Sequence, residues 1–593
     1  WTLTLPITFG SSPFWTLIMG IEYERLHFET TSVLIRRLPA EEVQDHALFP
    51  ICQEINYSGY DDQGNPKVDD KFPRNEILTV PEGTVELNKR DGYYGWDNQF
   101  GTHTANVKQF GASKFLASNY EFWEFMQAGG YTTEKYWTEE GWKWCSSKVV
   151  EKPLFWMPDK VVNGKQTYKY RTLTKVIDMP WDWPVEVNFH EAKAFCNWKS
   201  EVTGKPIRLL SEEEYYRIRD NLKGDQPNWE FGKVGNINLE YAASSCPVNK
   251  FSINGFYDVV GNVWQHTETL LDKWNGFRVF WLVDDFSTTK FDMKHNVMKG
   301  GSWASTGNLA THYYRAAFRR HFYQYAGIRY VESNNPVVNR TDAYETDSAV
   351  SQYLEFHYGD RVYFGVPNFP QKCAELCVEV CKANGVKLGR ALDLGCSVGR
   401  STFELAKLGF QEVIGIDLSA RFFQMAFKFR ELQKLHYKMP IEGDIQEDRV
   451  IDLVKLGLQD VKDRVKFYQG DASNLNAQKL GKFDLVFGGN LLCRMKVPRK
   501  LLLNVHEFLN PGGIFILVSP CTWLTDFTDK EEWIGGYVKK DGTCVTTYQG
   551  IKSYLQDRFV EIKEPHEVEF VIRETRRKFQ HSFSQATYWK KKD

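Results

Sequence analysis

From residue 351 onward, short apolar runs alternate with amphipathic stretches. The first run, ALDL at 391–394, leads through a glycine-rich turn into a helical pattern, and the second, EVIGID at 412–417, ends in an acid. Three more apolar runs follow before residue 520. Buried strands separated by helices produce this pattern. The sequence therefore predicts an α/β fold of the nucleotide-binding type at the carboxyl end.

The first three fifths of the chain show fewer regular elements. Residues 14–38 place apolar side chains at helical spacing until Pro39, which predicts one amphipathic helix that needs partners to fold. Similar spacing predicts helices at 112–128, 189–202 and 211–220. The segments between them are rich in Gly, Asn, Asp and Trp, so we expect a loop-rich domain held together by large side chains.

Changes in composition suggest the domain boundaries. We expect a helical segment at 1–45, a loop-rich α+β domain at 46–335, a polar linker at 336–350 and the α/β domain at 351–593. A charged stretch at 430–467 is interpreted as a partly helical cover. The chain starts at Trp1, so we expect it to begin inside a domain, with upstream sequence missing.

Composition narrows the class of protein. The 593 residues are 42% hydrophobic and 25% charged, which is typical of a soluble chain of two to four domains. A net charge of −2 gives no case for nucleic acid. Pro and Gly interrupt the uncharged first 21 residues, which argues against a membrane helix. Eleven Cys without a C-x-x-C pair favour a reduced, cytoplasmic protein without a cysteine zinc site.

The glycine-rich turn carries the clearest chemistry. Asp393, Gly395 and Gly399 form the pattern Asp-x-Gly-Cys-x-x-Gly, and Asp417 ends the next apolar run. Glycine lets the backbone approach a ligand, and a carboxylate at 417 can accept hydrogen bonds from two ribose hydroxyls. The turn contains neither G-x-G-x-x-G nor a P-loop. It resembles the S-adenosylmethionine (SAM) methyltransferases, a Rossmann-like class I fold.

This resemblance assigns roles to the motif residues. It implies that Asp393, Gly395 and Gly399 pass over the methionine part of SAM, and that Asp417 binds the ribose. Asp471, at the end of the third apolar run, is expected to bind the adenine amino group.

The loop-rich region contains a second set of motifs. They are GWDNQFG (95–101), RLLSEEEYYR (208–217), NGFYDVVGNVWQHTET (254–269), GGSWAS (300–305) and GIRYV (327–331). Together they resemble the formylglycine-generating-enzyme-like fold, and within it the sulfoxide synthases of the ovothiol and ergothioneine pathways. In the alternative interpretation these residues only hold a loop-rich fold together.

The helix at 14–38 fits the same family, in which a DinB-like helical bundle carries the motif His-x-x-x-His-x-Glu. The two histidines of this motif and a further histidine from earlier in the bundle bind non-haem iron. The resemblance implies that residues 1–45 are a remnant of that bundle. Here His27 and Glu29 match the motif, and Tyr23 replaces its first histidine. Two imidazoles at i and i+4 share a helix face and can hold one metal ion. The resemblance implies Fe(II), with His27 as the candidate ligand.

Other positions depart from the family pattern. His266 stands where tryptophan is common, Leu271 or Asp272 where a tyrosine near the iron is expected, and Ala316-Ala317 where Asn-Trp would hold the imidazole substrate. Arg319 and Arg320 are candidates to clamp an amino-acid carboxylate, with an internal salt bridge as the alternative.

The methyl acceptor is expected at the exit of the fourth apolar run. Asn490, His357, Tyr358 and Trp523 are the catalytic or acceptor-pocket candidates, since 355–375 and 521–537 resemble segments that flank this domain in ovothiol synthases. Each of the four also has a structural interpretation.

The combined resemblance implies a bifunctional ovothiol-synthase-like enzyme. Its amino half would couple cysteine sulfur to histidine with iron and O2, giving 5-histidylcysteine sulfoxide. Its carboxyl half would N-methylate 5-thiohistidine with SAM. The expected partners are these small molecules, with no nucleic acid and no membrane. Two alternatives remain: a methyltransferase with an inactive oxygenase half, and a non-catalytic ligand-binding scaffold.

Overall fold

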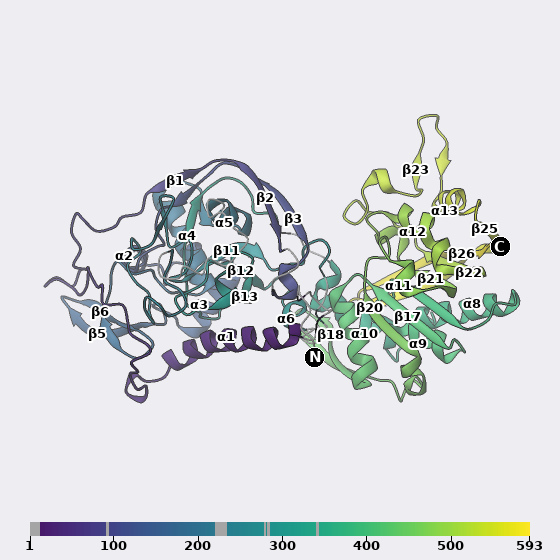
Figure 1. The fold of residues 1–593 in the computed structure, drawn as a ribbon, viewed down its shortest axis with the longest axis horizontal. Helices are drawn as coiled ribbons and strands as arrows, with labels where there is room; N and C mark the ends of the chain where they lie inside the picture. The colour runs from purple at the N-terminus through teal and green to yellow at the C-terminus, as the bar shows by residue number, and fades with distance from the viewer. Residues whose placement is uncertain are drawn as a thin grey trace. The chain divides into compact units, whose positions relative to one another are not determined.

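The computed structural model describes residues 14–89, 94–219, 234–277, 285–339 and 343–592, together with Ile7, Ser12 and Phe280. The chain divides into two compact units (Figure 1). The first unit comprises Trp1–Phe280 and Lys290–Thr341, and the second comprises Trp281–Thr289 and Asp342–Asp593. No helix within the described ranges is long and apolar enough to cross a membrane.

The first unit is built from small sheets joined by long loops. One sheet has the order β1 (Ile77–Val80), β4 (Phe110–Ser113), β15 (Tyr330–Glu332), β8 (Ile207–Leu209). A second has the order β13 (Ala316–Arg319), β12 (His295–Lys299), β11 (Trp264–Leu270), β14 (Ala326–Gly327). The smaller sheets are β5 (Trp156–Val162) with β6 (Lys165–Arg171) and β7 (Val176–Asp178), β2 (Gly83–Asn88) with β3 (Thr102–Val107), and β9 (Ser252–Ile253) with β10 (Phe256–Tyr257).

The helices of this unit begin where their sequences place capping residues. They are α1 (Phe14–Arg36), α2 (Asn119–Gln127), α3 (Glu139–Lys148), α4 (Phe189–Thr203) and α5 (Glu212–Arg219). The helices predicted at 14–38, 189–202 and 211–220 are confirmed. The prediction of a helix at 112–128 is wrong before residue 118, because Ser118 and Glu121 form a capping box there and start α2.

Buried charged side chains fasten α1 to the first unit, along whose outer face it runs (Figure 1). Glu22 accepts a hydrogen bond from the backbone N–H of Asn308 at 3.2 Å. Arg36 donates to the carbonyl of Arg171 at 2.6 Å and forms an ion pair with Glu186. The partners that the sequence requires for this helix are therefore supplied by the loop-rich domain itself.

The second unit contains a seven-stranded sheet. Its order is β20 (Val465–Gln469), β17 (Glu412–Asp417), β16 (Arg390–Leu394), β21 (Phe483–Gly489), β22 (Leu509–Ser519), β26 (Phe579–Lys591), β25 (Phe559–Arg573). The first five strands are parallel, and β26 pairs antiparallel with β22. The five predicted apolar runs are these parallel strands, so the predicted α/β fold is confirmed.

Helices connect the strands of this unit. They are α6 (Asp285–Thr288), α7 (Asp347–Tyr358), α8 (Phe369–Ala383), α9 (Arg400–Lys407), α10 (Ala420–Leu432), α11 (Ala477–Leu480), α12 (Pro498–Asn504) and α13 (Thr547–Leu555). Two short hairpins complete the unit: β18 (Lys434–Glu442) with β19 (Ile445–Asp452), and β23 (Tyr537–Val538) with β24 (Cys544–Val545).

One sequence interpretation needs correction here. The stretch 430–467, interpreted as a partly helical cover, consists mainly of the β18–β19 hairpin, because side chains of β18 alternate between buried and exposed and Gly443 turns the chain at φ +54°. The last residues of the proposed linker 336–350 are helical, since α7 begins at Asp347 and Thr346 caps it by accepting the N–H of Ala349 at 3.1 Å.

Candidate functional site

The loop between β16 and α9 has a backbone that requires glycine. Gly395 and Gly399 adopt φ +68° and +92°. A Cβ at Gly395 would lie 3.0 Å from the side chain of Leu491, and one at Gly399 would lie 2.5 Å from the ring of Phe467. Glycine is thus dictated both by conformation and by close packing.

Asp393 anchors this loop from inside. Its Oδ2 accepts hydrogen bonds from the hydroxyls of Ser401 and Thr402, each at 2.7 Å, in the first turn of α9. Burial raises the pKa of Asp393 to about 6, although both hydrogen bonds act in the opposite direction. The predicted motif carboxylate therefore holds the loop against the helix.

Asp417 joins the loop to the end of β17. Its two carboxylate oxygens accept the backbone N–H groups of Ser397 and Ser419, each at 2.8 Å. The side chain is half-buried at the carboxyl edge of the sheet. A carboxylate oxygen can accept two hydrogen bonds, so this geometry is compatible with ribose hydroxyls as further donors.

Asp471 lies on the same edge, directly after β20. It is exposed, and its Oδ1 accepts the N–H of Ser473 at 2.8 Å. Because β20, β17 and β16 are adjacent and parallel, Asp471, Asp417 and Gly395 follow neighbouring strand ends. In doubly wound sheets, ligands bind outside these ends.

His357 and Tyr358, at the end of α7, also support the loop. His357 Nδ1 accepts the N–H of Arg400 at 3.3 Å, and Tyr358 donates to the carbonyl of Val398 at 2.7 Å. Burial, with Arg400 nearby, lowers the pKa of His357 to about 3. The imidazole is therefore neutral at physiological pH, and its Nδ1 lone pair is occupied by the backbone.

Asn490 and Trp523, the other two candidates, lie in different parts of the second unit. Asn490 follows β21 with φ +54°, and its side-chain oxygen accepts the hydroxyl of Ser584 at 2.7 Å. Trp523 is buried and donates from Nε1 to Thr547 at 2.9 Å, so it packs toward α13. Of the two, Asn490 stands at the strand edge where an acceptor would meet SAM.

The proposed iron ligands of the first unit do not converge. His27 is exposed, and its ring lies edge-on to Tyr23 with centroids 4.5 Å apart. Glu29 is buried and accepts hydrogen bonds from Trp264, Ser302 and Ser305 at 2.6–2.8 Å. Within the described parts of the chain, no three His, Cys, Asp or Glu side chains gather as a metal site. These residues do not fit an iron donor set.

Arg320, one of the two candidate arginines, is bonded to other residues of the first unit. Arg320 donates to Asn296 at 2.9 Å and to the carbonyl of Met293 at 3.0 Å, and it forms an ion pair with Glu140. Arg319 is exposed at the end of β13. The salt-bridge alternative therefore describes Arg320.

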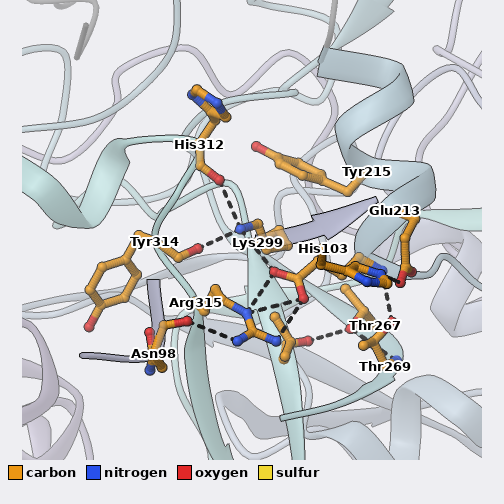
Figure 2. A network of polar contacts seen from close by, with 12 residues as sticks. Asn98, His103, Glu213, Tyr215, Thr267, Thr269, Lys299, His312, Tyr314 and Arg315 are labelled. Carbon is orange, nitrogen blue, oxygen red and sulfur yellow. Dashed lines mark hydrogen bonds and ion pairs between the residues drawn. The ribbon is translucent and has the colours of Figure 1, made fainter. Parts of the chain in front are cut away.

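A buried ionic network lies beside the positions that depart from the family pattern. Arg315 binds both oxygens of Glu212 at 3.0–3.2 Å, and Lys299 lies 3.4 Å from the same carboxylate. Figure 2 shows Lys299 bonded to the carbonyls of His312 and Tyr314, and Arg315 reaching Asn98. Burial lowers the pKa of Lys299 to about 7. These donors are satisfied by protein groups, so the network holds loops together.

His266 is part of the same packed interior. It is buried, and its Nε2 lies 2.9 Å from the carbonyl of Val187, to which it donates as the neutral tautomer. Burial lowers the pKa of His266 to about 4.

Comparison with known proteins separates the same two regions. Residues 62–334 match the model of the sulfatase-modifying factor enzyme 1-like domain, and residues 386–564 match that of a methyltransferase domain. The chain joins these two domains. The predicted fold classes of both regions are therefore confirmed.

The curated relatives include two kinds of protein, ergothioneine-related enzymes and formylglycine-generating-enzyme relatives. Hercynine oxygenase of Mycobacterium tuberculosis is 28% identical over 214 residues, covering 35% of this chain and 48% of that protein. Ergothioneine biosynthesis protein 1 of Schizosaccharomyces pombe is 25% identical, covering 43% and 28%. Inactive C-alpha-formylglycine-generating enzyme 2 of Bos taurus is 26% identical, covering 39% and 77%. The chain spans about half the length of the hercynine oxygenase it matches.

These findings fit a fusion of the ovothiol or ergothioneine synthase type. Sequence reasoning identified the glycine loop and Asp417 correctly as neighbours. It missed Leu491, which packs against Gly395, because only the fold brings the end of β21 to that loop.

Proposed function

We propose that the second unit is a SAM-dependent methyltransferase that methylates an imidazole nitrogen of 5-thiohistidine in an ovothiol-type pathway in the cytoplasm. The observation that carries the proposal is the loop of Gly395 and Gly399 next to Asp417 at the carboxyl edge of the sheet. The methyltransferase domain match supports SAM as donor. The acceptor rests on the resemblance to ovothiol synthases.

The proposed reaction is an in-line displacement. The lone pair of an imidazole nitrogen forms a bond to the methyl carbon of SAM while the carbon–sulfur bond breaks and its electrons pass to sulfur, leaving S-adenosylhomocysteine. The imidazole then releases a proton from its other nitrogen to water. The loop and Asp417 would align the donor, and alignment supplies most of the rate enhancement in such a step.

No buried base is required in this account. His357 is neutral, but its Nδ1 accepts the N–H of Arg400. His357 and Tyr358 therefore position the loop. Asp417 would bind the ribose and Asp471 the adenine amino group.

We further propose, from its relatives, that the first unit derives from a sulfoxide synthase that couples cysteine to histidine with iron and O2. The described residues do not fit an iron site, because His27 is exposed, Tyr23 stands in place of the first motif histidine, and no three His, Cys, Asp or Glu side chains gather within the described part of the chain. This observation favours the second candidate function, a methyltransferase joined to a first unit without oxygenase activity.

The methyltransferase proposal is tested by incubating the full chain with 5-thiohistidine and SAM carrying a ¹³C-methyl group. A new N-methyl resonance by NMR is expected, reduced about tenfold or more in Asp417→Asn through the loss of a charge-assisted hydrogen bond. Asp448→Asn, an exposed site on β19, is the matched control. Wild-type protein that forms no methylated product contradicts the proposal.

The first unit is tested separately by O2 consumption with cysteine, histidine and Fe(II). The second candidate function predicts no uptake above that of free iron. Uptake coupled to sulfoxide formation would assign the oxygenase activity to this chain.

A further inference from the structure

An arginine outside the sequence motifs stands at the same edge of the second unit. Arg494 belongs to the short 3₁₀ helix η8 (Leu492–Arg494), a few residues after β21. Leu491, three residues earlier, is the side chain that packs against Gly395. Arg494 is half-buried, and its helix follows directly on the residue that contacts the loop we assign to the methyl donor.

The hydrogen bonds of Arg494 fix its orientation. Nε donates to the hydroxyl of Tyr344 at 3.1 Å. Nη1 donates to the carbonyls of Thr522 at 2.6 Å and Cys493 at 3.1 Å, and Nη2 donates to the hydroxyl of Thr522 at 3.0 Å. The ring of Phe527 lies 4.9 Å from the guanidinium carbon. The planar group is thus held rigidly before any ligand arrives.

All of these acceptors are neutral. A guanidinium has five N–H groups, and the bonds above use four, so one N–H of Nη2 has no acceptor within the described part of the chain. No carboxylate among the described residues forms an ion pair with Arg494. The guanidinium can therefore offer its remaining N–H and its charge to an anion.

Several arginines of the second unit differ in this respect. They pair with carboxylates as Arg390–Glu412, Arg400–Glu404, Arg421–Asp347, Arg449–Glu355 and Arg573–Glu447. Arg464 resembles Arg494, since it is half-buried and bonded to a carbonyl, but it lies before β20, away from the strand ends that carry the glycine loop. Its place beside the residue that contacts this loop therefore distinguishes Arg494.

Aromatic side chains connect Arg494 to the proposed donor site. The ring of Tyr344 lies 5.9 Å from that of Tyr353 and 5.6 Å from that of Phe527. Burial above all, together with Tyr344 and Asp417 nearby, raises the pKa of Tyr353 well above its ordinary value. Arg494 therefore contacts an aromatic group, Tyr344 with Tyr353 and Phe527, whose Tyr353 also lies close enough to Asp417 for the two to interact electrostatically.

We propose that Arg494 binds the carboxylate of an α-amino acid at the methyl-transfer site, an inference that rests on the proposed function. The remaining N–H of the guanidinium fork can donate one charge-assisted hydrogen bond to a carboxylate oxygen. Two ligands carry this group: the methionine part of the donor, and an amino-acid acceptor such as 5-thiohistidine. The alternative is that Arg494 only ties η8 to the segment at Thr522.

The test compares ligands that differ only in the carboxylate, by calorimetry on the full chain. The donor pair is S-adenosylhomocysteine and S-adenosyl-3-thiopropylamine. The acceptor pair, titrated with S-adenosylhomocysteine saturating, is 5-thiohistidine and its decarboxylated amine. For one pair, the wild type is expected to prefer the carboxylate ligand by about ten- to a hundredfold. The pair that shows this preference identifies the source of the carboxylate.

In Arg494→Gln the preference is expected to fall to within about threefold, while the affinity for the carboxylate-free ligand stays unchanged. Arg464→Gln is the matched control. Arg464 is half-buried, donates to the carbonyl of Phe410 at 3.2 Å and lies at the end of β20 opposite to Asp471. Arg494→Lys keeps the charge without the fork and is expected to retain part of the preference. It serves as the readout if the glutamine variant does not fold.

Three results would overturn the inference. The first is a wild type without preference in either pair. The second is an Arg494→Gln variant that keeps the full preference. The third is an equal loss for both members of a pair, which indicates the structural role. Wild-type protein that does not bind S-adenosylhomocysteine at all would overturn the proposed function as well, and so separates the two failures.

Discussion

Asp417 in the second unit and Glu29 in the first are both motif carboxylates, yet their surroundings differ. Asp417 is half-buried at a strand edge, and its described donors are two backbone N–H groups of neighbouring turns. Glu29 is 2% exposed and accepts from Trp264, Ser302 and Ser305, more than 230 residues away. A motif match therefore identifies the fold in both units, whereas the contacts decide which carboxylate can meet a ligand.

The largest effect expected is in the glycine loop of the second unit. In Gly399→Val, a side chain would enter the space of the Phe467 ring at a backbone φ of +92°. We expect binding of S-adenosylhomocysteine to weaken by more than about a hundredfold, since both strain and steric overlap oppose the fold of the loop.

Gly385→Ala provides the control for that substitution. Gly385 also has positive φ (+67°), but no atom lies within 4 Å of the position that a Cβ would take there. This variant is expected to lose about 1 kcal/mol of stability and to keep its ligand affinity. Equal loss of binding in both variants would show that the loop is not the ligand site.

Glu29→Ala should destabilise the first unit. It leaves the buried donors Trp264, Ser302 and Ser305 without their acceptor, so the free energy of unfolding should fall by about 3 kcal/mol. His27→Ala, two residues earlier on the exposed side, should change it by less than about 0.5 kcal/mol. Chemical denaturation of the full chain measures both. Similar values for the two variants would contradict the role of Glu29 as a buried acceptor that stabilises the first unit.

The pH dependence of stability tests whether folding raises the pKa of Asp393. Burial raises the pKa of Asp393 from 3.8 to about 6. A raised pKa means that the protonated form is favoured by folding, so its contribution is complete below pH 3.8 and is lost as pH rises through about 6. The stability of the wild type relative to Asp393→Asn should fall by about 3 kcal/mol between about pH 4 and pH 7. A difference that does not change with pH would contradict the role assigned to this carboxyl.

The smallest effect is expected at the proposed metal position. Tyr23→His places two imidazoles one turn apart on an exposed helix face. We expect Ni(II) affinity to rise by at most about tenfold, and to return to the wild-type value when His27→Ala is added. Tight stoichiometric binding of Fe(II) by the wild type would contradict the structural interpretation of the first unit.

The sequence predicted the parts of the molecule whose signals are local. The five parallel strands, the loop of Gly395 and Gly399 and the helices α4 and α5 all follow from spacing and short motifs. The hairpin of β18 and β19 was misread because its charges obscured a two-residue alternation.

The remaining features depend on contacts between distant residues. Arg494 carries no motif, and its neutral surroundings become visible only when Tyr344 and Thr522 are brought beside it. Arg320 was a substrate candidate because the sequence cannot show that Glu140 and Asn296 lie next to it.

Calorimetric titration of the full chain with S-adenosylhomocysteine measures whether the edge at Asp417 binds the adenosyl ligand at all. We expect one site per chain with micromolar affinity, and an affinity lower by about tenfold or more in Asp417→Asn. Absence of heat at millimolar ligand, with the protein folded, would contradict it.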